Sequence, residues 1–72
     1  MSAYTKNLSD YVKEKGINIS KMARDTGIPY FALYSSLIDT ARDRDLRDFE
    51  FMGICFFLGV DPRDFADKEA TL

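Results

Sequence analysis

Hydrophobic residues recur at intervals of three and four along most of this chain, which is the spacing of one face of an α-helix. Polar segments that carry glycine or aspartate separate these runs, and no segment alternates with the period of a β-strand. The pattern predicts five helices, which cover residues 2 or 5 to 15, 19–25, 29–37, 45–58, and a short stretch that begins at Pro62. The expected fold class is therefore all-α, with one domain over residues 1–72.

The segment 18–37 predicts two short helices joined by a tight turn. Asn18 suits the capping position of the first helix, because its side-chain oxygen can accept a backbone N–H that has no partner within the helix. Gly27 suits the left-handed position after that helix, and Pro29 suits the start of the next helix, where no N–H is needed. Two helices joined in this way form a helix-turn-helix, whose second helix can enter the major groove of DNA.

The expected core takes apolar residues from every predicted helix. The residues expected to be buried are Tyr4, Leu8, Tyr11, Val12, Met22, Ala23, Ile28, Leu33, Ile54 and Leu58. The stretch 45–58 holds more apolar residues than one helical stripe requires, so we expect that helix to be buried on more than one side. Gly53 weakens this helix and permits close packing against a neighbour.

Several of these features occur in the order of a known family, namely Met22-Ala23, Thr26-Gly27-Ile28, Leu33, and Leu58-Gly59-Val60-Asp61-Pro62 with Phe65. Over about residues 5–66 the chain resembles the Cro/phage-repressor helix-turn-helix family, also called XRE-type. The resemblance implies a compact five-helix, lambda-repressor-like DNA-binding domain with its helix-turn-helix at about residues 18–37. The alternative is a small helical bundle with an unrelated glycine turn.

The resemblance also implies which side chains read DNA. The family contacts base edges from the outer face of the second helix of the motif, and by position this face corresponds to Tyr30, Phe31, Tyr34 and Ser35. Tyrosine can donate a hydrogen bond to a base, and phenylalanine can contact a thymine methyl group, but side chains suited to bidentate base readout are absent. The equal alternative is that Tyr30 and Phe31 pack inward or against a protein partner.

Two positions depart from the family pattern. Ile19 stands near the start of the first helix of the motif, where the family often has a glutamine that binds phosphate. Ser36 stands at a core position that is usually apolar, so we expect Leu37 to replace it in the core and to rotate the second helix. Both departures leave the mode of docking on DNA open.

The charge balance argues against strong DNA binding, because affinity for DNA comes largely from cations that contact phosphates. The net charge is −2 and the isoelectric point is about 4.9. The candidate phosphate contacts in the first helix of the motif are Ser20, Lys21 and Arg24, for which an ordinary solvated face is an equal alternative. The candidates after the second helix are Arg42, Arg44 and Arg47. Aspartates at 39, 43, 45 and 48 interleave with these arginines, so a self-neutralised, solvated loop is an equal alternative.

The chain offers little for catalysis, and we expect neither an enzyme nor a bound cofactor or metal ion. It has no histidine, no cysteine pair and no glycine-rich phosphate loop. Its single cysteine, Cys55, lies among apolar residues, which predicts a buried reduced thiol in a cytoplasmic protein. No apolar run approaches the ~20 residues of a membrane helix, and the first residues are too polar for a signal peptide.

These observations predict a small transcriptional regulator of the prophage or plasmid repressor type, which binds double-stranded operator DNA. We expect a homodimer, because so short a chain is marginally stable alone and the apolar surplus in residues 45–58 suits a symmetric interface. The alternative for that surplus is that it simply fills the core. The competing hypothesis for function is a helix-turn-helix fold used for protein binding, as in an antirepressor or a regulatory subunit.

Overall fold

Four α-helices and three segments of π or 3₁₀ helix account for most of residues 2–66, which are the residues that the computed structural model describes. In chain order these are α1 (Ala3–Lys15), α2 (Ile19–Thr26), α3 (Tyr30–Leu33), the π-helix η1 (Tyr34–Ile38), the 3₁₀ turn η2 (Thr40–Arg42), α4 (Asp48–Leu58) and the 3₁₀ turn η3 (Pro62–Phe65). No strand occurs within residues 2–66, which agrees with the predicted all-α class. The fifth predicted helix is only the short turn η3.

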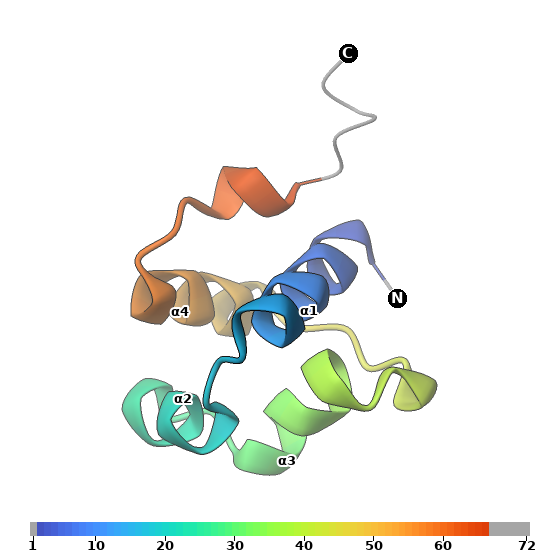
Figure 1. Ribbon diagram of the computed structural model, residues 1–72, viewed down its shortest axis with the longest axis vertical. Helices are drawn as coiled ribbons and strands as arrows, with labels where there is room; N and C mark the ends of the chain where they lie inside the picture. The colour runs from blue at the N-terminus through green and yellow to red at the C-terminus, as the bar shows by residue number, and fades with distance from the viewer. Residues whose placement is uncertain (1, 67–72) are drawn as a thin grey trace.

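The elements surround α1, which crosses the middle of the domain in Figure 1 with α2 and α3 on one side and η3 on the other. The fully or nearly fully buried apolar residues are Leu8, Val12, Ile19, Met22, Ile28, Leu33, Leu37, Leu46, Ile54, Cys55 and Phe65. Most of the predicted core is therefore confirmed. Tyr4, Tyr11, Ala23 and Leu58 are only half-buried and pack against the edge of this cluster.

The ends of the first two helices follow from local chemistry, as the sequence indicates. The hydroxyl of Ser2 accepts a hydrogen bond from the first turn of α1, and the Asn18 side chain accepts one from the backbone N–H of Lys21 at 3.0 Å. Gly27 ends α2 in the left-handed conformation, with φ of 77°, which a residue with a side chain adopts at a cost. The predicted caps of α2 are confirmed.

The start of α4 differs from its prediction, because the backbone of Leu46 bonds to α1 instead of extending the helix. The backbone N–H of Leu46 donates to the Thr5 hydroxyl at 3.2 Å, and the Tyr4 hydroxyl donates to the Leu46 carbonyl at 2.9 Å. These contacts join positions about 40 residues apart, which no local pattern reveals. The helix begins at Asp48 rather than at Asp45.

The outer side of α4 is uncovered, so the prediction that this helix is buried on more than one side is wrong for the single chain. Its inner side buries Ile54 and Cys55. On the other side Phe49, Met52 and Phe56 are 68%, 53% and 90% exposed. A wide apolar surface thus remains on the domain.

The second helix of the motif changes its winding after Leu33. The Asp39 N–H donates to the Tyr34 carbonyl at 2.8 Å, which is the i→i+5 bond of a π-helix. This wider turn holds an additional residue, so Ser36 and Leu37 are both fully buried. Leu37 therefore lies in the core as expected, but it does not displace Ser36, which is buried beside it.

Candidate nucleic-acid interface

The turn between α2 and α3 is fixed by both apolar packing and a side-chain hydroxyl. Met22, Ile28 and Leu33 are buried beneath it. The Thr26 hydroxyl donates to the Met22 carbonyl at 2.7 Å and accepts from the Ile28 N–H at 3.2 Å. Sequence reasoning overlooked this bridge, although a hydroxyl residue directly before a turn glycine is a known signal for such bonds. The turn therefore holds α3 at a defined angle to α2.

The outer face of α3 and of the start of η1 is aromatic. Tyr30, Phe31 and Tyr34 are 49%, 64% and 40% exposed, so none of the three packs fully inward in the single chain. The rings of Tyr30 and Tyr34 stack with their centroids 6.0 Å apart. We call Tyr30, Phe31 and Tyr34 the aromatic face.

Ser35 does not belong to the outer face, and its predicted position there is wrong. It is only 3% exposed, because η1 turns it toward the core. Its hydroxyl has no hydrogen-bond partner among the described residues. A buried side chain in this position has no access to a base edge.

The candidate phosphate contacts of α2 are exposed but partly neutralised. Ser20, Lys21 and Arg24 all face solvent. The carboxylate of Asp25 lies 3.3 Å from the Lys21 ammonium and 3.7 Å from the Arg24 guanidinium. Exposed ion pairs of this kind contribute little free energy, about 0–1 kcal/mol, so a phosphate could displace the aspartate.

Arg42 lies against the aromatic face. The central carbon of its guanidinium is 5.3 Å from the centroid of the Phe31 ring, a cation–π distance, and its Nε is 3.2 Å from a carboxylate oxygen of Asp39. Its partner is thus Asp39, three residues earlier in the chain. The contact places a cation beside the face that would meet DNA.

Arg44 serves the fold, so we withdraw it from the expected phosphate contacts. Its guanidinium makes two hydrogen bonds of 3.1 Å to the carboxylate of Glu50 and one of 2.8 Å to the Ser36 hydroxyl. Only 29% of its side chain is exposed. These bonds connect η1 to the first turn of α4.

Glu50 remains ionised although it is only 5% exposed. Burial alone would raise the pKa of its carboxyl group. Hydrogen bonds from Arg44 and from the Arg47 N–H, together with the charges of both arginines, outweigh burial and hold the pKa below its ordinary value. The buried carboxylate of Glu50 is thus held by Arg44 and by the Arg47 N–H. It stabilises the fold and is not available as an acid or base for catalysis.

Arg47 is the best placed of the three arginines for a phosphate. It is exposed, and no carboxylate of the described residues lies within ion-pair distance. Together with Pro29, Phe49 and Gly53 it lines a hollow of about 370 Å³ beside the turn between α2 and α3. A cation is therefore present next to the start of α3.

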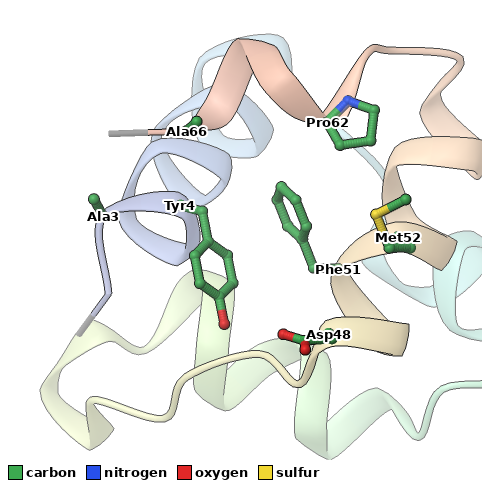
Figure 2. A pocket seen from close by; sticks show the side chains of 7 residues that line it. All are labelled: Ala3, Tyr4, Asp48, Phe51, Met52, Pro62 and Ala66. Carbon is green, nitrogen blue, oxygen red and sulfur yellow. The ribbon is translucent and has the colours of Figure 1, made fainter. Parts of the chain in front are cut away.

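A second hollow, of about 360 Å³, lies between α1, α4 and η3 (Figure 2). Its lining residues are Ala3, Tyr4, Asp48, Phe51, Met52, Pro62 and Ala66. Tyr4 and Phe51 meet edge to face with ring centroids 4.8 Å apart. Among the described residues that line this hollow, Asp48 alone is charged, and its charge is negative, so the hollow does not suit a phosphate.

Other chemistry is not visible within residues 2–66. No group of side chains there is arranged to hold a metal ion, and no helix is long and apolar enough to cross a membrane. Cys55 is buried as predicted, and this burial, with a smaller effect of Asp61, raises the pKa of its thiol to about 11. A thiol of that pKa is protonated at neutral pH and is a poor nucleophile or metal ligand.

A buried turn, two short helices and an exposed outer helix face define a helix-turn-helix domain. The comparison with protein families agrees: the family described as Cro/C1-type HTH DNA-binding domain matches residues 7–70. The chain belongs to this family, whose members are DNA-binding domains rather than enzymes. Neither the curated proteins nor the solved structures that were compared with the chain gave a match.

Proposed function

We propose that the protein is a transcriptional regulator of the prophage or plasmid repressor type, which acts in the cytoplasm and binds double-stranded operator DNA as a homodimer. The observation that carries the proposal is the exposed aromatic face on the second helix of a Cro/C1-type helix-turn-helix. In this motif the second helix lies in the major groove, with its first residues against the base edges.

The aromatic face would read DNA by single hydrogen bonds and apolar contacts. The hydroxyl groups of Tyr30 and Tyr34 can donate to base acceptors, and Phe31 can cover a thymine methyl group. Each such contact discriminates modestly, by about 1 kcal/mol, because none is bidentate. We therefore expect a preference for sites with thymine and a low overall specificity.

Backbone contacts would come from exposed cations that surround this face. Arg42 and Arg47 follow α3 in the chain, and Lys21 and Arg24 lie on α2 with Ser20. Three of these four cations are paired with exposed carboxylates, which a phosphate must displace. The proposed complex is therefore weak and depends strongly on both copies of the homodimer.

The second candidate function is protein binding. The aromatic face favours it, because Tyr, Phe and Arg are enriched in protein interfaces. The amides and arginines that read bases in pairs of hydrogen bonds are missing from the outer face of α3. An antirepressor or a regulatory subunit would use the same surface against another protein.

The test is selection of bound duplexes from a random pool at moderate salt, followed by titration of the selected duplex. We expect Tyr34→Ala to weaken binding by about 1 kcal/mol and to relax the preference at particular positions. Arg47→Ala should weaken binding to all sequences equally. Lys6→Ala removes an exposed cation of α1 outside the motif and is the matched control. It should change neither the affinity for DNA nor the sequence preference.

The refuting result concerns affinity at low salt. If no duplex binds more tightly than the non-specific range of roughly 10⁻⁴–10⁻⁶ M, the DNA proposal fails. The protein-binding function then becomes the better one.

A further inference from the structure

The uncovered side of α4 is a single apolar stripe. Phe49, Met52, Gly53 and Phe56 follow one another at helical spacing and therefore share one face. Phe56 is 90% exposed and Phe49 is 68% exposed, so residues 2–66 leave most of both side chains uncovered. We call these four residues the α4 stripe.

Gly53 leaves a notch in the middle of this stripe. Glycine inside a helix costs about 1 kcal/mol relative to alanine, so the position calls for a packing reason. Within the described chain there is none: a methyl group built on Gly53 would have no neighbouring segment within 4 Å. A notch that nothing in the same chain fills is suited to a side chain from another molecule.

The α4 stripe is also symmetric about its own centre. Phe49 and Phe56 lie at equal distances from the midpoint between Met52 and Gly53. If a second α4 lies antiparallel across this midpoint, each Phe49 meets Phe56 of the other copy, and each Met52 meets the notch at Gly53. A twofold interface requires this kind of self-complementary surface.

We propose that two copies of this chain associate through antiparallel α4 helices, with Met52 of each copy seated in the Gly53 notch of the other. This inference rests on the proposed function only in that it names the interface of the proposed homodimer. The antiparallel arrangement also sets the dipoles of the two α4 helices in opposite directions, which is favourable.

The exposed area indicates how stable the association is. An aromatic side chain covers about 150–250 Å², so the α4 stripe offers on the order of 400 Å² per copy and 800 Å² for the pair. Stable specific interfaces bury about 1,200–2,000 Å² in total. We therefore expect a reversible dimer with a Kd on the order of tens of micromolar, rather than an obligate one.

The test is sedimentation of the DNA-free protein from about 1 μM to 1 mM. Phe56→Glu should raise the dimer Kd at least tenfold, because it places a charge against the ring of Phe49. Gly53→Leu should raise the dimer Kd similarly by filling the notch. It should retain the fold because leucine favours helix and its Cβ would have no neighbouring segment within 4 Å. Lys6→Glu places a similar charge at an exposed position of α1 outside the α4 stripe and should leave the Kd unchanged.

A mixing experiment tests the antiparallel register. Phe49→Lys and Phe56→Glu should each give monomers alone, whereas an equimolar mixture should form a heterodimer. In that heterodimer the introduced lysine faces the introduced glutamate at one end, and the two unchanged phenylalanines meet at the other. A parallel arrangement pairs each position with itself and cannot give this result.

Three outcomes would overturn the proposal: wild-type protein that stays monomeric at 1 mM, a Phe56→Glu variant that dimerises like the wild type, or a mixture that forms no heterodimer. In the first case the α4 stripe would be free for a different protein. All these measurements are made without DNA, so a failure of duplex binding leaves them unaffected and the two proposals are separately refutable.

Discussion

At the scale of single residues, environment separates arginines that look alike in the sequence. Arg42 and Arg44 both lie in a run of alternating basic and acidic residues. Arg42 pairs with Asp39 in solvent, whereas Arg44 binds the nearly buried carboxylate of Glu50 and the buried hydroxyl of Ser36. The first is available to a ligand, and the second holds η1 against α4.

Arg44→Ala should therefore destabilise the protein, while Arg42→Ala should not. Removal of one partner from a fully buried ion pair costs about 3–5 kcal/mol. Because 29% of the Arg44 side chain is exposed, we expect a smaller loss, about 2 kcal/mol of unfolding free energy. Urea denaturation at pH 7 measures it, with Arg42→Ala expected within about 0.5 kcal/mol of the wild type. Equal losses in both variants would contradict this assignment.

Glu50 should give the stability a defined pH dependence. Its pKa in the folded chain lies below the ordinary value of 4.5. A group with a lowered folded pKa stabilises the fold fully above its unfolded pKa, and this contribution disappears as the pH falls through the folded pKa. Wild-type protein should thus be more stable than Glu50→Gln at pH 7, and the gap should narrow below about pH 4.5 in denaturant titrations. A gap that widens in acid would refute this.

At the scale of elements, η1 is the part of the motif that the sequence did not reveal. A segment of five residues is too short for the spacing of its apolar residues to distinguish a π-helix from an α-helix. The apolar pattern of residues 29–37 is therefore also compatible with an α-helix. The turn is held by tertiary contacts: the Ser9 hydroxyl of α1 donates to the Leu37 carbonyl, and Arg44 donates to Ser36. Burial of Ser35, and thus its loss from the DNA-facing surface, follows from this winding.

Two serine variants should distinguish a satisfied hydroxyl from an unsatisfied one. Ser9→Ala leaves the Leu37 carbonyl without its buried donor, so we expect a loss of about 1–3 kcal/mol in unfolding free energy. Ser35→Ala removes a buried hydroxyl that has no partner within residues 2–66, and it should be neutral or stabilising by up to about 1 kcal/mol. Thermal or urea denaturation compares the two. A larger loss for Ser35→Ala than for Ser9→Ala would contradict this description of η1.

At the scale of the whole molecule, the net charge of −2 means that only a few cations can contact phosphates, so we expect a moderate salt dependence of DNA binding. A dimer in which Arg42 and Arg47 of each copy contact phosphates would release about four counterions. The logarithm of the binding constant should then fall with the logarithm of the salt concentration with a slope of roughly −3 to −4. Fluorescence anisotropy across a salt series measures this slope, and Arg47→Ala should flatten it by about 2, one unit for each copy. A slope near zero for the wild type would exclude these contacts.

The sequence alone determined the features that depend on neighbouring residues. The cap at Asn18 and the turn at Gly27 follow from local hydrogen bonding and backbone freedom. The apolar spacing correctly predicted the burial of Met22 and Leu33. These local signals also sufficed to recognise the Cro/C1-type family, since the family pattern consists of such caps, turns and core positions.

Only the tertiary structure decided which surfaces are left for function. It placed the start of α4 at Asp48, buried Ser35, and paired Arg44 with Glu50, so that Arg44 is not available to a phosphate. Each result depends either on contacts between segments that are distant in sequence or on how tightly one helical turn is wound. The spacing of apolar residues along the chain contains no information on such contacts or on the winding. It also showed which apolar residues are surplus, because helical spacing marks a face as apolar but does not say whether another element covers it.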